Sequence, residues 1–105
     1  MKSRKIISVS TSPGKILYLK FEDGSEGQFC FTDYFGCDKE LSIKLLDDVY
    51  FAQVKINQDF GCIEWPNGYD PSPAVLYAII AKQKIVANNK IVFDPALGKN
   101  AWIAE

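Results

Sequence analysis

The segment KILYLKF, residues 15–21, constrains the fold most, because bulky apolar residues recur in it at every second position. Residues two apart in a β-strand share one face of the sheet. The apolar residues that share a face here are Leu17, Leu19 and Phe21. The sequence therefore predicts a half-buried strand with these three side chains in the core.

Turn signals lie on both sides of this strand. The preceding SPGK, residues 12–15, has proline and glycine at the second and third positions of a type II turn. After the strand, Asp23-Gly24 favours another sharp turn, and the chain then returns with Phe29 and Phe31 on one side. We predict an antiparallel meander over Lys5–Phe31.

The next part of the chain is less regular. Residues 32–48 mix glycine, acids and scattered leucines, which predicts a loop followed by a single helical turn. The segment FAQVKIN, residues 51–57, alternates again and predicts a strand with Val54 and Ile56 facing inward. It should pair with a second short strand at GCIEW, residues 61–65.

One main helix is predicted at about residues 73–82. Ser72 offers an N-cap oxygen, and Pro73 suits the first helical position, where the backbone amide has no intrahelical acceptor. Lys82 and Lys84 are expected in its last turn, where they complement the negative end of the helix dipole. The predicted buried stripe comprises Leu76, Ile79 and Ile80.

The remaining residues, 83–105, read as an extension of the small domain at 5–82. IVANNKIVF predicts a β-hairpin around Asn88-Asn89, because asparagine tolerates positive φ. Trp102 is the one large anchor in the tail. The predicted fold class is α+β, with antiparallel hairpins packed on one main helix and a C-terminal β-hairpin.

Composition excludes several classes of protein. Twelve basic and thirteen acidic residues among 105 give a formal charge of −1, so nucleic acid is an unlikely direct partner. No run of about 18 apolar residues exists to cross a membrane. The clusters Lys2-Arg4-Lys5 and Lys82-Lys84-Lys90 are interpreted as solvated surface.

The N-terminus and the cysteines indicate a cytoplasmic protein. Its first apolar stretch is too short for a signal peptide. The three cysteines, Cys30, Cys37 and Cys62, are odd in number and form no CxxC motif, as expected of reduced thiols. Cys37, in the predicted loop, is expected to be the most reactive.

The residues that most catalytic chemistry needs are missing. The chain has no histidine, which removes the commonest general base and metal ligand. The short cysteine spacing of zinc sites and the glycine motifs that bind phosphate are absent as well. We therefore predict no metal site, no cofactor and no catalytic residue. Paired carboxylates, Glu22 with Asp23 or Glu64 with Asp70, remain the only enzymatic option, and turn or surface roles explain them better.

The densest cluster of unusual residues is WPNGYDPSP, residues 65–73. Trp65 is predicted to face the core, Asn67-Gly68 to turn the chain, and Asp70 with Ser72 to bond backbone amides where the helix begins. Tyr69 is predicted to be exposed and is the best candidate for contact with a partner. The candidate binding residues are Glu64, Asn67, Tyr69, Asp70 and Trp102.

Three blocks in this order, FEDGSEGQFCF, LLDDVYFAQVKI and CIEWPNGYDPSPAVLY, resemble a small bacterial and phage family known only as domain of unknown function 2442, over about residues 5–82. The W-P-N-G-x-D block is the most specific part. The resemblance implies a compact α+β domain with an antiparallel sheet and relatives encoded beside a small partner in toxin–antitoxin-like pairs. It carries over no catalytic residue. Some relatives bear a helix-turn-helix domain, for which residues 83–105 are too few.

Two functional hypotheses follow. The first is a non-catalytic intracellular binding or regulatory module, such as an antitoxin-like subunit, which binds a protein partner or a second copy through a sheet edge and the C-terminal hairpin. The alternative is a small ligand-binding domain or enzyme that uses Glu64, Tyr69 and Asp70 in a shallow cleft.

Overall fold

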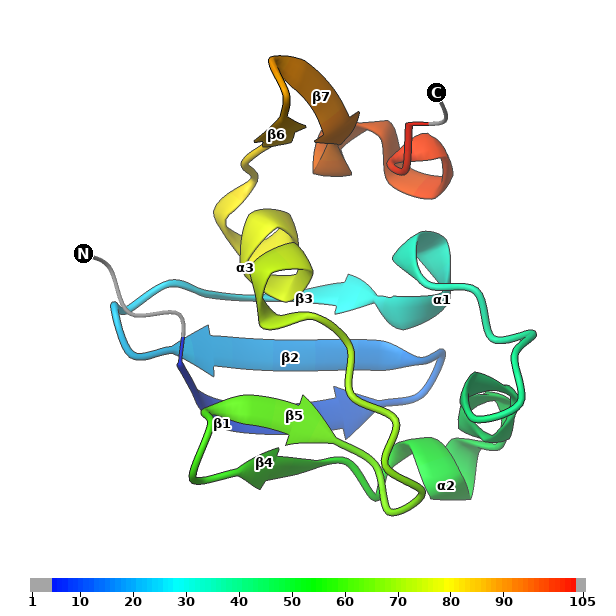
Figure 1. Cartoon of the computed structure of the whole chain (residues 1–105). Helices are drawn as coiled ribbons and strands as arrows, with labels where there is room; N and C mark the ends of the chain where they lie inside the picture. Colours follow the sequence, from blue (N-terminus) through cyan, green and yellow to red (C-terminus); the bar gives the residue numbers. More distant parts are fainter. Residues whose placement is uncertain (1–4, 104–105) are drawn as a thin grey trace.

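The computed structural model describes residues 5–103, so Lys2 and Arg4 of the predicted basic cluster lie outside the described residues. The chain begins with a three-stranded antiparallel sheet in the order β1-β2-β3. The strands are β1 (Ile6–Ser12), β2 (Ile16–Phe21) and β3 (Glu26–Cys30). This confirms the predicted meander (Figure 1).

The predicted strand face is buried as expected. Leu17, Leu19 and Phe21 on β2 have no exposed surface. Gly14, in the turn between β1 and β2, has a φ of +89°, as the third position of a type II turn requires. The turn residues and the alternation of apolar residues therefore both predicted this part of the fold correctly.

The middle of the chain is more helical than the sequence predicted. The helical elements are α1 (Phe31–Tyr34), the 3₁₀ helix η1 (Ser42–Leu46) and α2 (Asp48–Phe51). The predictions of a strand end at Phe31 and of a strand start at Phe51 are wrong, since both residues belong to helices. The reason is tertiary: their rings pack together at 5.6 Å, and burial of large aromatic rings outweighs weak local preferences.

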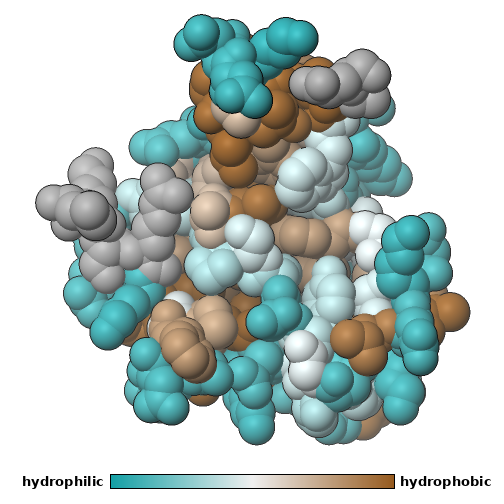
Figure 2. All heavy atoms as spheres, in the orientation of Figure 1, coloured by the Kyte–Doolittle hydropathy of each residue, from teal (hydrophilic) through white to brown (hydrophobic). Residues whose placement is uncertain are grey.

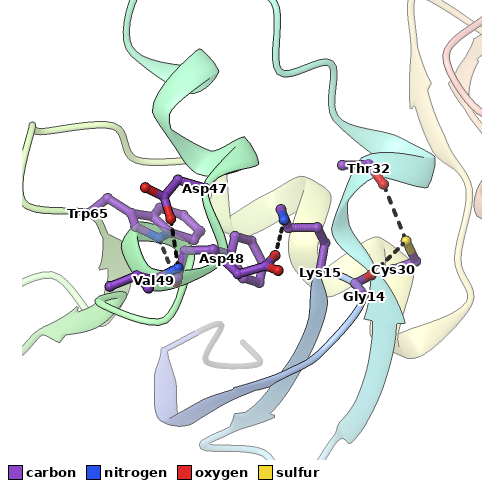
Figure 3. A network of polar contacts seen from close by, with 9 residues as sticks. Gly14, Lys15, Cys30, Thr32, Asp47, Asp48, Val49 and Trp65 are labelled. Atoms are coloured by element: carbon purple, nitrogen blue, oxygen red, sulfur yellow. Dashed lines mark hydrogen bonds and ion pairs between the residues drawn. The ribbon is translucent and has the colours of Figure 1, made fainter.

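Helix α2 is fixed at its N-terminus by two aspartates (Figure 3). The carboxylate of Asp47 accepts a hydrogen bond from the backbone N–H of Val49 at 2.9 Å, which is the N-cap arrangement. Asp48 forms an ion pair with Lys15, which lies in the turn between β1 and β2. The first contact caps α2, and the ion pair attaches it to the end of the sheet.

The second predicted strand pair is present but shorter than expected. It comprises β4 (Lys55–Asn57) and β5 (Cys62–Glu64), which pair antiparallel. The backbone carbonyl of Gly61 accepts a hydrogen bond from the N–H of Ile6 at 2.7 Å, so this hairpin is joined to β1. Val54 and Ile56, predicted to face inward, are half-buried.

The main helix, α3 (Pro73–Ala81), begins where predicted, and the side chain of Ser72 accepts a hydrogen bond from the N–H of Val75. Its C-terminal boundary differs from the prediction. Lys82 adopts the left-handed conformation, with φ of 58° and ψ of 46°, and caps the helix. Lys82 and Lys84 therefore lie beyond the last turn, not within it.

Helix α3 lies across the sheet and is buried on more than one side (Figure 1). Leu76 and Ile79 are buried as predicted, whereas Ile80 is half-buried above Gly27 of β3. Val75, Tyr77 and Ala78 are buried as well, which a single predicted stripe did not include. Tyr77 packs against the sheet, with its ring centroid 5.0 Å from that of Phe21. The residues after the helix lie on the side of α3 away from β2 (Figure 1).

These residues, 83–103, form the C-terminal extension. It contains the hairpin β6 (Ile85–Ala87) and β7 (Lys90–Phe93), and the 3₁₀ segment η2 (Pro95–Asn100). Asn88 and Asn89 both have positive φ, which confirms the predicted hairpin turn. The structure is thus α+β, with antiparallel sheets and several helices. Within residues 5–103 no helix is long and apolar enough to cross a membrane.

Candidate partner-binding surface

Trp65 is the center of the strand-to-helix corner. It is fully buried, as predicted, and its rings lie 5.6 Å from those of Phe31 and of Phe51. Its indole N–H donates a hydrogen bond to the backbone carbonyl of Phe51 at 2.9 Å. Its backbone closes the following turn, since its N–H donates to the carbonyl of Tyr69 at 3.0 Å. Trp65 is therefore part of the core.

Asn67 connects this corner to the helical middle of the chain. Its side-chain oxygen accepts from the N–H of Tyr69 at 3.1 Å, and its side-chain nitrogen donates to the carbonyl of Leu41 at 2.9 Å. Its backbone N–H donates to the hydroxyl of Tyr50 at 2.8 Å. Three bonds to three separate partners give this candidate binding residue a structural role.

Tyr69 does not have the exposure predicted for it. The side chain is half-buried, and its ring centroid lies 5.9 Å from that of Trp65 and 6.5 Å from that of Phe31. Burial raises the pKa of Tyr69, and the nearby Cys37 and Asp70 raise it further. The predicted exposure was wrong because the corner folds back against the aromatic core.

Glu64 and Asp70 both lie near the thiol of Cys62. Glu64 accepts a hydrogen bond from the side chain of Asn57 at 2.9 Å. Asp70 is exposed, and its carboxylate makes no hydrogen bond to residues 5–103, so the predicted bond to a backbone amide is absent. Burial raises the pKa of the Cys62 thiol, and Asp70 and Glu64 raise it further.

The surroundings of Cys37 and of the acidic side chains bear on the predicted reactivity and metal binding. Burial raises the pKa of Cys37, although the nearby Lys15 lowers it, which favours the protonated thiol. That Cys37 is the most reactive of the three cysteines stays a prediction. Among the described residues, no group of three cysteine, aspartate or glutamate side chains is placed to hold a metal ion. The corner residues thus serve mainly to pack and to fix the turn.

Trp102, the remaining candidate, lies on the C-terminal extension, at the end of the molecule opposite β4 and α2 (Figure 1). It forms an antiparallel bridge with Phe93, and the two ring centroids are 4.6 Å apart. Its indole N–H donates to the backbone carbonyl of Tyr34 at 2.7 Å. The indole is still 52% exposed, so Trp102 both anchors the extension and borders its surface.

Tyr34 is an anchor that sequence reasoning missed. Besides the bond from Trp102, its hydroxyl donates to the carbonyl of Pro95 at 3.0 Å, and its ring lies 6.1 Å from that of Phe93. Phe93 and Ala101 have no exposed surface and belong to the same core cluster as the sheet. The extension therefore completes the core instead of forming a separate unit. No local sequence signal marks Tyr34, because its partners lie some 60 residues away.

The extension presents an apolar surface to solvent. Val86 and Ile91 are cross-strand partners, and Ile103 follows Trp102 on the segment bonded to β7, where its N–H donates to the carbonyl of Val92. We call Val86, Ile91 and Ile103 the outer face; they are 60%, 40% and 40% exposed. Figure 2 shows apolar atoms gathered over this end of the molecule, bordered by polar side chains.

Comparison with known proteins places most of the chain in one family. A family model described as a protein of unknown function, DUF2442, matches residues 6–82. The chain belongs to the DUF2442 family. No curated protein and no solved structure is significantly similar to it.

The DUF2442 region and the extension differ in the surface they offer. Within the DUF2442 region, most residues of the corner at 65–70 pack in the core or form hydrogen bonds inside the domain. The extension lies beyond the match and carries the outer face. Residues 82–103 also contain four lysines, at positions 82, 84, 90 and 99, and a single aspartate, Asp94. The extension therefore adds exposed apolar side chains and an excess of lysines to the DUF2442 domain.

Proposed function

We propose that this DUF2442 protein is a non-catalytic binding module that recruits a protein partner through the outer face of its C-terminal extension. The observation that carries the proposal is the solvent exposure of Val86, Ile91 and Ile103 on one short hairpin and its bridged tail. Fully burying a side chain of this kind contributes roughly 1.5–3 kcal/mol. Because these side chains are 40–60% exposed, a partner that covers the outer face would gain about half of this for each of them.

The rest of the extension supports the same proposal. The extension also carries Trp102 and Leu97, which are about half exposed, and four lysines at positions 82, 84, 90 and 99. Protein interfaces commonly combine an apolar center containing aromatic side chains with a polar rim. An antitoxin-like or regulatory subunit would use such a surface. The corner at Trp65–Asp70 is the other candidate surface. Most of its side chains pack or form hydrogen bonds inside the domain, so they are less available to a partner.

A pair of matched double variants tests this proposal. Ile91→Ser with Ile103→Ser removes apolar area from the outer face. Ile43→Ser with Val49→Ser makes the same change at exposed positions on η1 and α2, 52% and 72% exposed, at the other end of the molecule. Point substitutions are preferable to deletion of the extension, because deletion would remove Phe93 and Ala101 from the core.

The wild-type chain would be used to capture its partner from the native host, and the partner would then be purified and titrated by calorimetry. We expect the outer-face variant to bind it at least about tenfold more weakly, which corresponds to ~1.4 kcal/mol. The η1–α2 variant should bind as the wild type does. Equal affinity of the outer-face variant and the wild type, or failure to capture any partner, would contradict the proposal.

A further inference from the structure

The β6 strand has an open edge. Within residues 5–103, β6 pairs only with β7. In a two-residue hairpin, the residues that flank the turn, here Ala87 and Lys90, exchange both backbone hydrogen bonds. The next pair, Val86 and Ile91, is then a non-hydrogen-bonded pair. The N–H and C=O of Val86 therefore point away from β7, toward the open edge.

A groove runs along this edge. It has a volume of about 280 Å³ and lies between β6 and α3. Helix α3 contributes two small residues, Ala74 and Ala78, together with Tyr77, and the other wall is residues 83–86. The volume is close to the lower limit of about 300 Å³ for small-molecule pockets, so it suits one or two side chains better than a whole ligand.

The charge of the groove indicates which segment would fit. Lys84 lines the groove, and Lys82 and Lys90 lie a few residues from Lys84 in the sequence. Asp23 is close as well, since it accepts a hydrogen bond from the hydroxyl of Tyr77 at 2.5 Å. A second copy that paired its own β6 across a two-fold axis would bring lysines of the two copies together. The carboxylates of an acidic segment from another protein would be attracted by Lys84, on the wall opposite Tyr77 and its partner Asp23.

We propose that the β6 edge binds an extended, acidic segment of a partner protein as an added antiparallel or parallel strand. The backbone of the segment bonds to the N–H and C=O of Val86, one apolar side chain enters the groove above Ala74 and Ala78, and flanking carboxylates face Lys84. Strand addition of this kind derives affinity from backbone bonds and specificity from side-chain pockets. The inference rests on the proposed function, because it names how the same extension holds its partner.

The key variant is Val86→Pro, which removes the outward N–H. Proline is tolerated at an edge position whose N–H faces solvent, so the hairpin should stay folded. Val86→Ala is the matched control, since it shortens the same side chain and keeps the N–H. Lys84→Glu is a second, independent variant that reverses an exposed charge and leaves the backbone intact. Circular dichroism and thermal melting would verify the fold of all three.

The probe is a library of random ten-residue peptides displayed on phage and selected against the full-length protein. We expect enriched peptides to alternate apolar with acidic residues. Their affinity should be about fivefold lower for Val86→Pro than for Val86→Ala, since the two variants both shorten the side chain and differ in one backbone hydrogen bond. Lys84→Glu should weaken binding as well, because it reverses the charge that faces the carboxylates.

Three outcomes would overturn strand addition: no enriched peptide, enriched peptides without acidic residues, or peptides that bind Val86→Pro as tightly as Val86→Ala. Raising the salt concentration should weaken binding to the wild type more than to Lys84→Glu. The proposed function is tested separately, because its test measures the affinity of a captured partner for the variant with Ile91→Ser and Ile103→Ser. If the outer-face variant loses that partner and no peptide binds as expected, the proposed function is supported and only strand addition is rejected.

Discussion

The indole N–H of Trp102 donates a hydrogen bond to the backbone carbonyl of Tyr34 at 2.7 Å, across 68 positions of the chain. The hydroxyl of Tyr34 donates in turn to the carbonyl of Pro95 at 3.0 Å. One residue at the end of α1 thus holds the C-terminal extension at two points. The first bond uses the backbone of Tyr34, whereas the second is removable by substitution.

Tyr34→Phe should loosen the extension. Loss of the part-buried hydroxyl bond leaves the carbonyl of Pro95 without this donor, and we expect the free energy of unfolding to fall by about 1 kcal/mol. Urea denaturation measures the change, and hydrogen exchange should show faster exchange within residues 85–103. Tyr18→Phe is the control, because Tyr18 donates a bond of 2.7 Å to Glu26 on the surface and its loss should cost less. Equal effects of the two substitutions would contradict the anchoring role of Tyr34.

Asn67 and Asp70 should differ sharply in their contribution to stability. Asn67→Ala removes side-chain bonds to the backbone of Tyr69 and of Leu41, and should lower the free energy of unfolding by about 1–2 kcal/mol. Asp70→Ala removes an exposed carboxylate and should change it by less than about 0.5 kcal/mol. Urea denaturation of the two variants checks this order. A larger loss with Asp70→Ala would show that the corner is held differently.

Gly61 and Gly14 form a matched pair of glycines with positive φ. Gly61 has a φ of +66°, and an added Cβ would lie 2.6 Å from Cγ and 2.8 Å from Cβ of Lys5. Gly14 has a φ of +89° and nothing within 4 Å of an added Cβ. Gly14→Ala should therefore cost only the backbone strain, about 1 kcal/mol, whereas Gly61→Ala adds a steric cost of roughly 1–3 kcal/mol. Thermal unfolding of both variants measures the difference, and similar melting temperatures would contradict the close approach at Gly61.

Stability should decrease at alkaline pH. Burial raises the pKa of Cys37 and of Cys62 above the ordinary 9.0, and that of Tyr34 and Tyr69 above the ordinary 10.0. The unfolded chain therefore loses these protons at lower pH than the folded protein, so their contribution is complete below pH 9 and is lost as pH rises through 9 and 10. Urea midpoints measured under reducing conditions from pH 7 upward test this expectation. Tyr69→Phe should lessen the decrease above pH 10, and an unchanged profile would contradict the role given to Tyr69.

Where the sequence predicted the fold well, the signal was local. Ser72 and Pro73 define the start of α3 through capping chemistry, and Asn88-Asn89 defines a hairpin because both residues accept positive φ. The region between Phe31 and Phe51 was predicted poorly. Its short helices contain few residues each and depend on aromatic contacts with Trp65, which no local pattern reveals.

The candidate site was predicted only in part, for the same reason. The sequence correctly singled out the corner as a turn with Trp65 inside, but assigned the exposed position to Tyr69 and the backbone bonding to Asp70. In the structure Asn67 makes those bonds and Tyr69 packs on the core. Which of several polar residues in a turn meets a distant carbonyl depends on where Leu41 and Tyr50 lie, and this is decided by the packing of η1 and α2.

The sequence by itself determined the family, the α+β class, the meander, the start of the main helix and the C-terminal hairpin, because periodicity, caps and turns act over a few neighbouring residues. Only the tertiary structure decided that the extension shares the core, that Tyr34 holds it, and that Val86, Ile91 and Ile103 remain in solvent. Whether an apolar residue is buried depends on surfaces brought together from distant parts of the chain. For this protein, those surfaces meet at α3, between the sheet and the extension.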